Sequence, residues 1–190
     1  LIMNARFTKD VILALLKRCF PRIFRYVQYY LHDSLLSDMA ETRIKLFREL
    51  VAGSKNKNCL QIGVREKKYA PHWVSVDLYN ISDLIDFNYD IHDLKFKEEI
   101  FDIVVCNAVL EHVEDPIKAI KELSRVLKKG GLIWVELPFC QPYHPIPHDF
   151  WRVSPEGIRV WMRDFSEISG GLFKIDKSLI YNGVYFYGRK

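Results

Sequence analysis

Two different patterns of hydrophobic residues divide the chain near residue 53. Before this point apolar side chains recur at helical spacing, most clearly in VILALLKRCF and ETRIKLFRELV, and Gly53 is a plausible stop signal before the polar stretch SKNKN. From residue 59 onward, short apolar runs typical of buried strands alternate with polar or helical stretches. We therefore predict an N-terminal helical segment over residues 1–52 and a sheet-containing domain over residues 53–190.

The second part reads as alternating strands and helices. Its strand candidates are CLQI, WVSVD, FDIVVCN and GGLIWVELPF, with a weak fifth candidate at FNYDI. A helix is predicted between Asn107 and Gly130, because Asp115 can cap it and Pro116 suits its first turn. Its apolar face comprises Ile117, Ile120, Leu123, Val126 and Leu127. Strand, helix and strand in this order predict a right-handed crossover and a mostly parallel α/β sheet.

The C-terminal end carries a different signal. Asn182-Gly183 stands between two runs of aromatic and β-branched residues, which is typical of a tight hairpin. We therefore expect the sheet to end in an antiparallel pair of strands, with its turn at these two residues.

Composition narrows the setting without naming a partner. The net charge of +4 is mild, so no nucleic-acid partner is expected. The four cysteines are widely spaced and form no C-x-x-C pair, which favours a reduced, cytoplasmic setting. No apolar run approaches the roughly 20 residues of a membrane-spanning helix, and the run at 11–16 is too short for a signal peptide.

The segment before residue 30 is basic and rich in aromatic residues. Two interpretations stay open for it. It could contact an anionic membrane or a partner protein peripherally, or it could be a packed helix with a solvated basic face, which is the commoner arrangement.

Candidate site residues follow from the expected topology. In open parallel sheets, ligands bind beyond the carboxyl ends of the strands. The segments that would meet at this edge are residues 63–66, 77, 90–93, 107–112 and 138–152.

The stretch FDIVVCNAVLEHVEDPIKAIKELSRVLKKGGLIWVELPF resembles the centre of class I S-adenosylmethionine-dependent methyltransferases, particularly the type 11 group. The shared features are the FD start, the EH pair, the DP helix start, the E-x-x-R-V-L-K run and the GG before the next strand. HDFWRVSPEGI is similar to a segment that follows this strand in a subset of these enzymes. The resemblance covers residues 59 to about 160. It implies a Rossmann-like, doubly wound sheet with a reversed last strand, and S-adenosyl-L-methionine as the cofactor.

The resemblance also implies roles for individual residues. The backbone at Gly63 would pass the methionine part of the cofactor, and Asp77 would accept hydrogen bonds from the ribose hydroxyls. Asp90 would lie near the adenine amino group with Ile91 beside the ring. Two further residues would lie near the sulfonium and the acceptor: Asn107 and Ala108.

The cofactor turn departs from the family pattern. Gln61 stands where an acid is usual, and Arg65 and Lys67 stand where glycines are common. About ten residues separate the first two strands, so the usual helix between them must be very short or absent. Arg65 could pair with the cofactor's carboxylate, or it could be a solvated loop residue on a degenerate site.

The loop CQPYHPIPHDFWR holds the candidate catalytic residues. If the acceptor is a hydroxyl, His144, His148 or Asp149 could take its proton, although each could instead brace the loop. We predict no metal site, because the spacing of Cys140 and the two histidines matches no familiar zinc pattern.

Two other residue pairs have alternative interpretations that remain open. Glu111 and His112 could contact the site or act as a base, or they could fix a strand-to-helix turn. Trp151 and Arg152 favour packing and a salt bridge, although a tryptophan face can also hold a sugar.

The first functional hypothesis is methyl transfer to a small-molecule or glycan acceptor, and a lipid-linked glycan would suit the basic N-terminal segment. The alternative is a methyltransferase-like module without turnover that binds or scaffolds a partner. A dehydrogenase is disfavoured because its second and third phosphate-binding glycines are absent.

Overall fold

The computed structural model describes residues 18, 41–145, 147–174 and 182–190. Most of the predicted N-terminal helical segment, including nearly all of its basic stretch, therefore lies outside the described residues. Residues 39–190 form one compact unit, which contains a helix over residues 41–52. The division of the chain at residue 52 stays a prediction.

A six-stranded mixed sheet forms the centre of this unit, in the order β2-β1-β3-β4-β6-β5. The strands β1 to β4 are mutually parallel, and β6 runs antiparallel to both of its neighbours. This arrangement confirms the Rossmann-like sheet with an antiparallel C-terminal end. The strands are β1 (Cys59–Ile62), β2 (Val74–Val76), β3 (Phe101–Asn107), β4 (Leu127–Cys140), β5 (Ser166–Lys174) and β6 (Asn182–Arg189).

Two details of the sheet differ from the sequence-based expectation. The weak candidate FNYDI contributes a single isolated bridge, between Phe87 and Val76. The turn predicted at Asn182-Gly183 is wrong, because these residues open β6 and pair with Lys174 and Phe173. A Cβ atom on Gly183 would lie 2.5 Å from the ring of Phe173. This glycine therefore permits close packing between strands.

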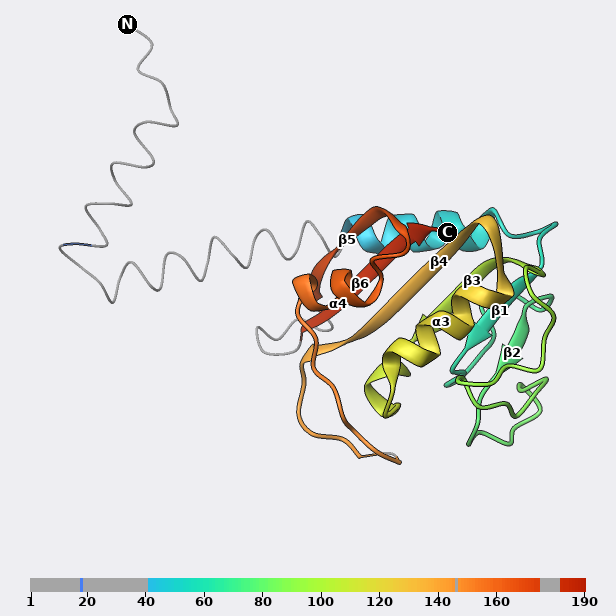
Figure 1. The fold of residues 1–190 in the computed structure, drawn as a ribbon, viewed down its shortest axis with the longest axis horizontal. Helices are drawn as coiled ribbons and strands as arrows, with labels where there is room; N and C mark the ends of the chain where they lie inside the picture. The colour runs from blue at the N-terminus through green and yellow to red at the C-terminus, as the bar shows by residue number, and fades with distance from the viewer. Residues whose placement is uncertain (1–17, 19–40, 146, 175–181) are drawn as a thin grey trace, which may run out of the picture. The chain divides into compact units, whose positions relative to one another are not determined.

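Helices cover both faces of the sheet (Figure 1). On one face lie α3 (Pro116–Val126) and α4 (Pro155–Trp161), packed against side chains such as Val104 and Cys106 of β3. On the other face the helix over residues 41–52 packs against the alternate side chains, Ile103 and Val105. The alternation follows from the two-residue period of a strand and explains why β3 is apolar almost throughout.

The helix α3 begins as predicted but ends earlier. The Asp115 carboxylate accepts a hydrogen bond from the Lys118 N–H at 2.9 Å, and Pro116 is the first helical residue. The helix stops at Val126 rather than at Gly130, because Leu127 already pairs with Phe101 of β3. The position of α3 places its N-terminus and the preceding turn at the carboxyl ends of the strands.

The helix over residues 41–52 is attached by aromatic contacts and one ion pair. The ring of Phe47 lies 5.0 Å from that of Trp134 and 4.9 Å from that of Tyr69. Arg43 pairs with Glu136 at 2.5 Å and lies over the ring of Phe173. In the part of the chain that the structure describes, no helix has the length and hydrophobicity that crossing a bilayer requires.

Candidate functional site

The turn after β1 lies directly against the end of β3. Gly63 has a positive φ of 77°, and its N–H donates to the Val76 carbonyl at 2.9 Å. A Cβ atom at this position would lie 2.4 Å from Cγ2 of Val109 and 3.2 Å from the Asn107 carbonyl oxygen. Both the backbone conformation and the close approach therefore require glycine.

Gln61 organises the loop that follows this turn. Its side chain is buried, its Oε1 accepts from the Tyr69 N–H at 2.9 Å, and its Nε2 donates to the Gly63 and Lys67 carbonyls at 3.3 and 3.4 Å. An ionised acid could accept but could not donate. Residues 63–73 form only turns, bends and irregular structure, as the short connection predicts. The amide thus holds together a loop that lacks the family's usual helix.

Asp77 lies at the carboxyl end of β2, beside this turn. Its Oδ1 accepts from the N–H groups of Tyr79 and Asn80 at 3.0 and 2.9 Å, and its Oδ2 accepts from the Val64 N–H at 3.2 Å. A carboxylate has about four acceptor positions. The half-buried Asp77 is therefore held in place and retains acceptor capacity for a ligand hydroxyl.

Asp90 and Ile91 lie farther along the same edge. Asp90 accepts from the His92 backbone N–H at 2.8 Å and faces the His92 ring Nδ1 at 2.7 Å, and these bonds lower the pKa of its carboxyl. About half of the Asp90 side chain (52%) is exposed. Ile91 is buried in the core under α3.

The end of β3 places Asn107 and Ala108 close to the Gly63 turn. Asn107 Nδ2 donates to the Tyr69 hydroxyl at 3.2 Å. Ala108 is exposed, has a positive φ of 52°, and donates its N–H to the Glu136 carbonyl at 2.9 Å. Such a conformation costs a non-glycine residue about 1 to 3 kcal/mol, and strain of this kind is concentrated at functional sites.

Arg65 does not join this group. It is exposed, and within the described residues it has no hydrogen-bond or ion-pair partner. Its guanidinium is therefore free to meet an incoming anion, but nothing in the chain positions it in advance.

The loop after β4 is braced by a buried ion pair. Both oxygens of Asp149 meet Arg152, at 2.5 and 2.7 Å, and Oδ2 also accepts from the His144 N–H at 2.8 Å. The Asp149 side chain is 1% exposed. The bonds from Arg152 hold the pKa of this carboxyl far below its usual range. These contacts are those of a brace that keeps the loop in one conformation.

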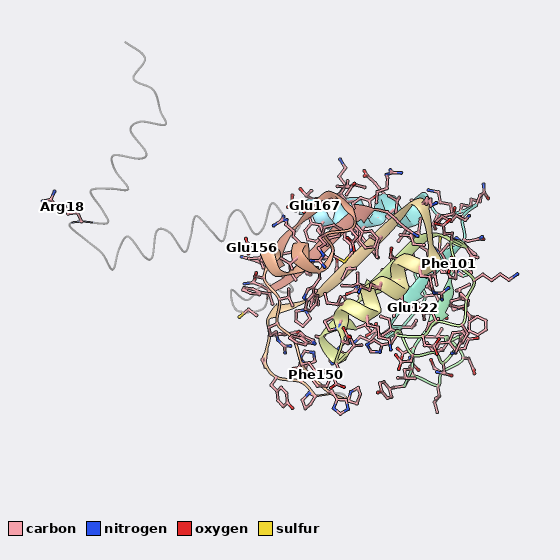
Figure 2. The ribbon with its side chains drawn as sticks, viewed as in Figure 1. Arg18, Phe101, Glu122, Phe150, Glu156 and Glu167 are labelled. Carbon is pink, nitrogen blue, oxygen red and sulfur yellow. The ribbon has the colours of Figure 1, made fainter. Side chains whose placement is uncertain are left out.

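His148 points elsewhere. Its ring lies 5.5 Å from that of Phe150, and its carbonyl oxygen accepts a hydrogen bond from His112 Nδ1. Figure 2 shows Phe150 on this loop, well separated from Phe101 at the start of β3. The Phe150 N–H donates to the Glu111 carbonyl at 2.7 Å, so the loop lies against the turn after β3.

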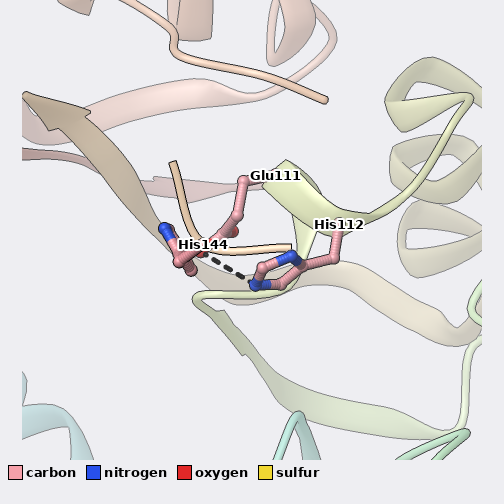
Figure 3. Close-up of side chains that lie close together, drawn as sticks. All are labelled: Glu111, His112 and His144. Atoms are coloured by element: carbon pink, nitrogen blue, oxygen red, sulfur yellow. Dashed lines mark ion pairs between the residues drawn. The ribbon is translucent and has the colours of Figure 1, made fainter. Parts of the chain in front are cut away.

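Three side chains converge where this loop meets the turn after β3 (Figure 3). Glu111 and His112 belong to the 3-10 turn η1 (Leu110–His112), and His144 comes from the loop after β4. One ligand atom from each residue lies within 4.8 Å of the others. The sequence presents Glu111 and His112 as an adjacent pair and His144 as a separate candidate, and the tertiary structure brings all three together.

Glu111 is the most perturbed group of the cluster. Its side chain is 1% exposed, and neither carboxylate oxygen has a hydrogen-bond partner among the described residues. Burial raises its pKa from 4.5 to about 8, against smaller opposing effects of its own backbone N–H and of the Arg152 charge. Perturbed carboxyls of this kind are typical of functional sites, and sequence spacing alone gives no sign of the burial.

Two surface hollows lie away from this edge. One of about 120 Å³ is bordered by α3 and α4, and another lies beside the helix over residues 41–52. The strand-tip site is defined by its converging polar groups.

Comparison with known proteins identifies the family. A family model described as a methyltransferase domain matches residues 24–135. The chain belongs to this methyltransferase family. The expected membership of the class I S-adenosylmethionine-dependent methyltransferases is thereby confirmed.

The relatives of this methyltransferase domain have different named activities. It is 29% identical over 99 residues to a tRNA U34 carboxymethyltransferase of Campylobacter fetus, covering 46% of this chain and 32% of that one. It is 34% identical over 98 residues to a demethylmenaquinone methyltransferase of Staphylococcus saprophyticus, covering 52% and 37%. The chain thus spans about a third of the length of these two relatives.

Solved structures show the same fold. The N-methyltransferase NodS of Bradyrhizobium japonicum, solved in complex with S-adenosylhomocysteine, superposes with a TM-score of 0.58 at 18% identity. The match covers 81% of this chain and 88% of NodS.

Proposed function

We propose that this protein transfers a methyl group from S-adenosylmethionine to a small-molecule or glycan acceptor, at a hydroxyl group. The family match supports the cofactor, and so does the bound S-adenosylhomocysteine in the structurally similar NodS. The observation that carries the proposal is the grouping of the Gly63 turn, the Asp77 carboxylate and the strained Ala108 at neighbouring strand tips.

The residues at these tips fit the cofactor. Because Gly63 has no Cβ atom, its turn lies directly against Val109 and the Asn107 carbonyl, which keeps the turn after β1 and the end of β3 together at one edge of the sheet. Asp77 is held by three backbone N–H groups, which leaves about one of its four acceptor positions for a ribose hydroxyl. When bound, the sulfonium supplies an already activated methyl group, so the protein mainly has to align the acceptor with it.

The acceptor side is the loop after β4 together with η1. Of the three predicted catalytic residues, His144 lies in the cluster with Glu111, while Asp149 has both oxygens bonded to Arg152. We assign the proton-accepting role to the cluster side of the site, with His144 as the base and Asp149 as the residue that positions its backbone.

Exposed aromatic rings on the same loop support a ring-shaped acceptor. Tyr143 is 74% exposed and Phe150 is 48% exposed, which leaves their faces free to pack on a sugar or another flat ring. Trp151 is more engaged, because its indole N–H donates to the Val113 carbonyl at 2.9 Å. A cytoplasmic setting and a peripheral membrane contact through the N-terminal segment remain expectations.

A non-catalytic binding module is the second candidate function. The observations that favour it are the exposed Arg65 without a positioning partner and the loop that replaces the helix after β1. Titration calorimetry of the full chain with S-adenosylhomocysteine separates the two candidates. Measurable heat with a raised melting temperature supports the enzyme, whereas no heat and an unchanged melting temperature support the module.

Two variants locate the binding. Asp77→Asn removes the charge and weakens the acceptors, so we expect roughly 10- to 100-fold weaker affinity. Asp83→Asn is the matched control, because this aspartate is exposed and follows the strand by a few residues. Equal affinities of the two variants would contradict the proposed role of Asp77.

A further inference from the structure

The cluster at the acceptor edge contains a buried carboxylate that lacks a hydrogen-bond partner. Both oxygens of Glu111 are without hydrogen bonds among the described residues, although the side chain is 1% exposed. Burying a polar group without a hydrogen-bond partner is unfavourable, and burying a charged one is more so. A protein that keeps such a group beside two imidazoles has an arrangement suited to a cation.

The hydrogen bonds of His112 direct one ring nitrogen toward Glu111. Its Nδ1 lies against the carbonyl oxygen of His148, which can only accept, so the proton is on Nδ1. The lone pair is then on Nε2, and this is the atom that lies 3.7 Å from Glu111 Oε1. Histidines that bind metals usually donate their other N–H to a carbonyl or carboxylate in this way.

The ring of His144 is oriented by a similar bond. Its Nδ1 lies 2.9 Å from the Pro142 carbonyl oxygen and 3.2 Å from Arg152 Nη2. The carbonyl can only accept, so the shorter contact places the proton on Nδ1 and the lone pair on Nε2. The Arg152 guanidinium can only donate, so in this tautomer it makes no hydrogen bond to Nδ1. Arg152 brings a positive charge near the cluster, but both oxygens of Asp149 pair with it and compensate that charge.

We propose that Glu111, His112 and His144 bind a divalent transition-metal ion of the zinc type. Two imidazoles and one carboxylate form a ligand set used in catalytic zinc sites, with a further position open to water or substrate. In a tetrahedral site with bonds of about 2.05 Å, ligand atoms lie about 3.3 Å apart. The three ligand atoms, which lie within 4.8 Å of one another, would have to draw together by up to about 1.5 Å to reach this separation.

The ligand types decide which ions fit. Magnesium and calcium prefer sites made only of oxygen ligands, whereas imidazole suits zinc, copper, iron and nickel. The sequence-based expectation of no metal site considered only Cys140, His144 and His148 on the loop. The structure supplies the other two ligands from the turn after β3.

The position of the cluster suggests what the ion does. The turn η1 follows Ala108 closely, and Val109 contacts the Gly63 turn. This part of the inference rests on the proposed function: an acceptor hydroxyl bound to the ion would lose its proton to water more easily and would be held toward the methyl group. With the ion bound, His144 is a ligand, and the ion takes over the role that His144 has as the base in the metal-free site. Binding of the ion itself does not depend on that function.

The test is a zinc titration of the full chain after treatment with a chelator. We expect one zinc ion per chain by calorimetry, no comparable heat with magnesium, and a visible absorption band when cobalt(II) replaces zinc. Glu111→Gln and His144→Asn should each weaken zinc binding at least about 10- to 100-fold, since even the loss of a residue that only hydrogen-bonds to a metal ligand has an effect of this size.

His148→Asn is the matched control. It removes the same type of side chain from the same loop, but its ring lies against Phe150 rather than in the cluster. The proposal is overturned if no stoichiometric zinc binds, if Glu111→Gln leaves affinity unchanged, or if His148→Asn weakens binding as much as His144→Asn. Circular dichroism of each variant checks that it is folded.

S-adenosylhomocysteine titration of the same samples separates this inference from the proposed function. If the nucleoside binds and zinc does not, the metal site fails and the proposed function stands. If zinc binds and S-adenosylhomocysteine does not, the metal site stands and the proposed function fails.

Discussion

Replacing Glu111 with glutamine should remove the loss of stability that this carboxyl causes as the pH rises from 4.5 to about 8. The Glu111 carboxyl is buried beside His112 and His144, with the Arg152–Asp149 pair nearby, and burial is the main cause of its raised pKa. The unfolded chain has no such burial. Between the two pKa values the native state therefore keeps a proton that the unfolded state has lost.

The sign and size follow from this difference. Because the native state binds more protons over this interval, the free energy of unfolding falls as the pH rises, by about 1.4 kcal/mol per pH unit. The pKa rises from 4.5 to about 8, so the full contribution is about 5 kcal/mol. It is fully present below pH 4.5 and is lost once the pH exceeds the folded-state value of about 8. Between pH 5 and 7 the expected loss is about 3 kcal/mol.

The measurement is urea unfolding of the wild type and of Glu111→Gln at several pH values, in the presence of a chelator. Glutamine has nearly the same shape and does not ionise, so the difference between the two curves isolates the carboxyl. We expect the variant to gain stability relative to the wild type as the pH rises. Parallel dependences for the two proteins would refute the claim that Glu111 is buried without a compensating partner.

Three further substitutions test the loops around the site by urea unfolding. Gly63→Ala should lower the free energy of unfolding by about 2 kcal/mol more than Gly130→Ala, because both glycines have a positive φ but only at Gly63 would the new Cβ meet another side chain. Equal losses of stability would contradict the close approach at Gly63. Gln61→Glu should destabilise by about 2 kcal/mol or more at neutral pH, since two carbonyls lose their donor; an unchanged midpoint would speak against this role. Asp149→Asn should lower the free energy of unfolding by about 3 kcal/mol near pH 7. This difference from the wild type should shrink as the pH falls below the ordinary aspartate pKa of 3.8, because the ion pair with Arg152 stabilises the fold only while the carboxyl is ionised. A difference that grows on acidification would contradict the pairing.

Local patterns were enough to predict the main elements of the fold. The apolar runs at β1, β3 and β4 specify strands because only a sheet covered on both faces buries such continuous runs. The cap at Asp115 and the proline after it located the start of α3. The order of these elements placed Gly63 and Asp77 at the same edge of the sheet.

Contacts between distant segments could not be read in this way. Asn182-Gly183 has the composition of a turn, but the ring of Phe173 on the neighbouring strand uses the space beside the glycine. From the sequence, Gln61 is only a departure from the acid that is usual in the cofactor turn. The structure shows that its amide makes three hydrogen bonds that hold the loop together.

The Glu111, His112 and His144 cluster shows most clearly the difference between what local sequence patterns predict and what contacts between distant segments decide. The sequence supplied a carboxylate and imidazoles in the turn after β3 and in the loop after β4. It also indicated that both segments lie at the carboxyl edge of a parallel sheet. Only the tertiary structure decided that a carboxylate from the turn and an imidazole from the loop meet in a buried position. The physical reason is that burial and proximity depend on the path of a loop braced by a distant ion pair, and no local pattern encodes that path.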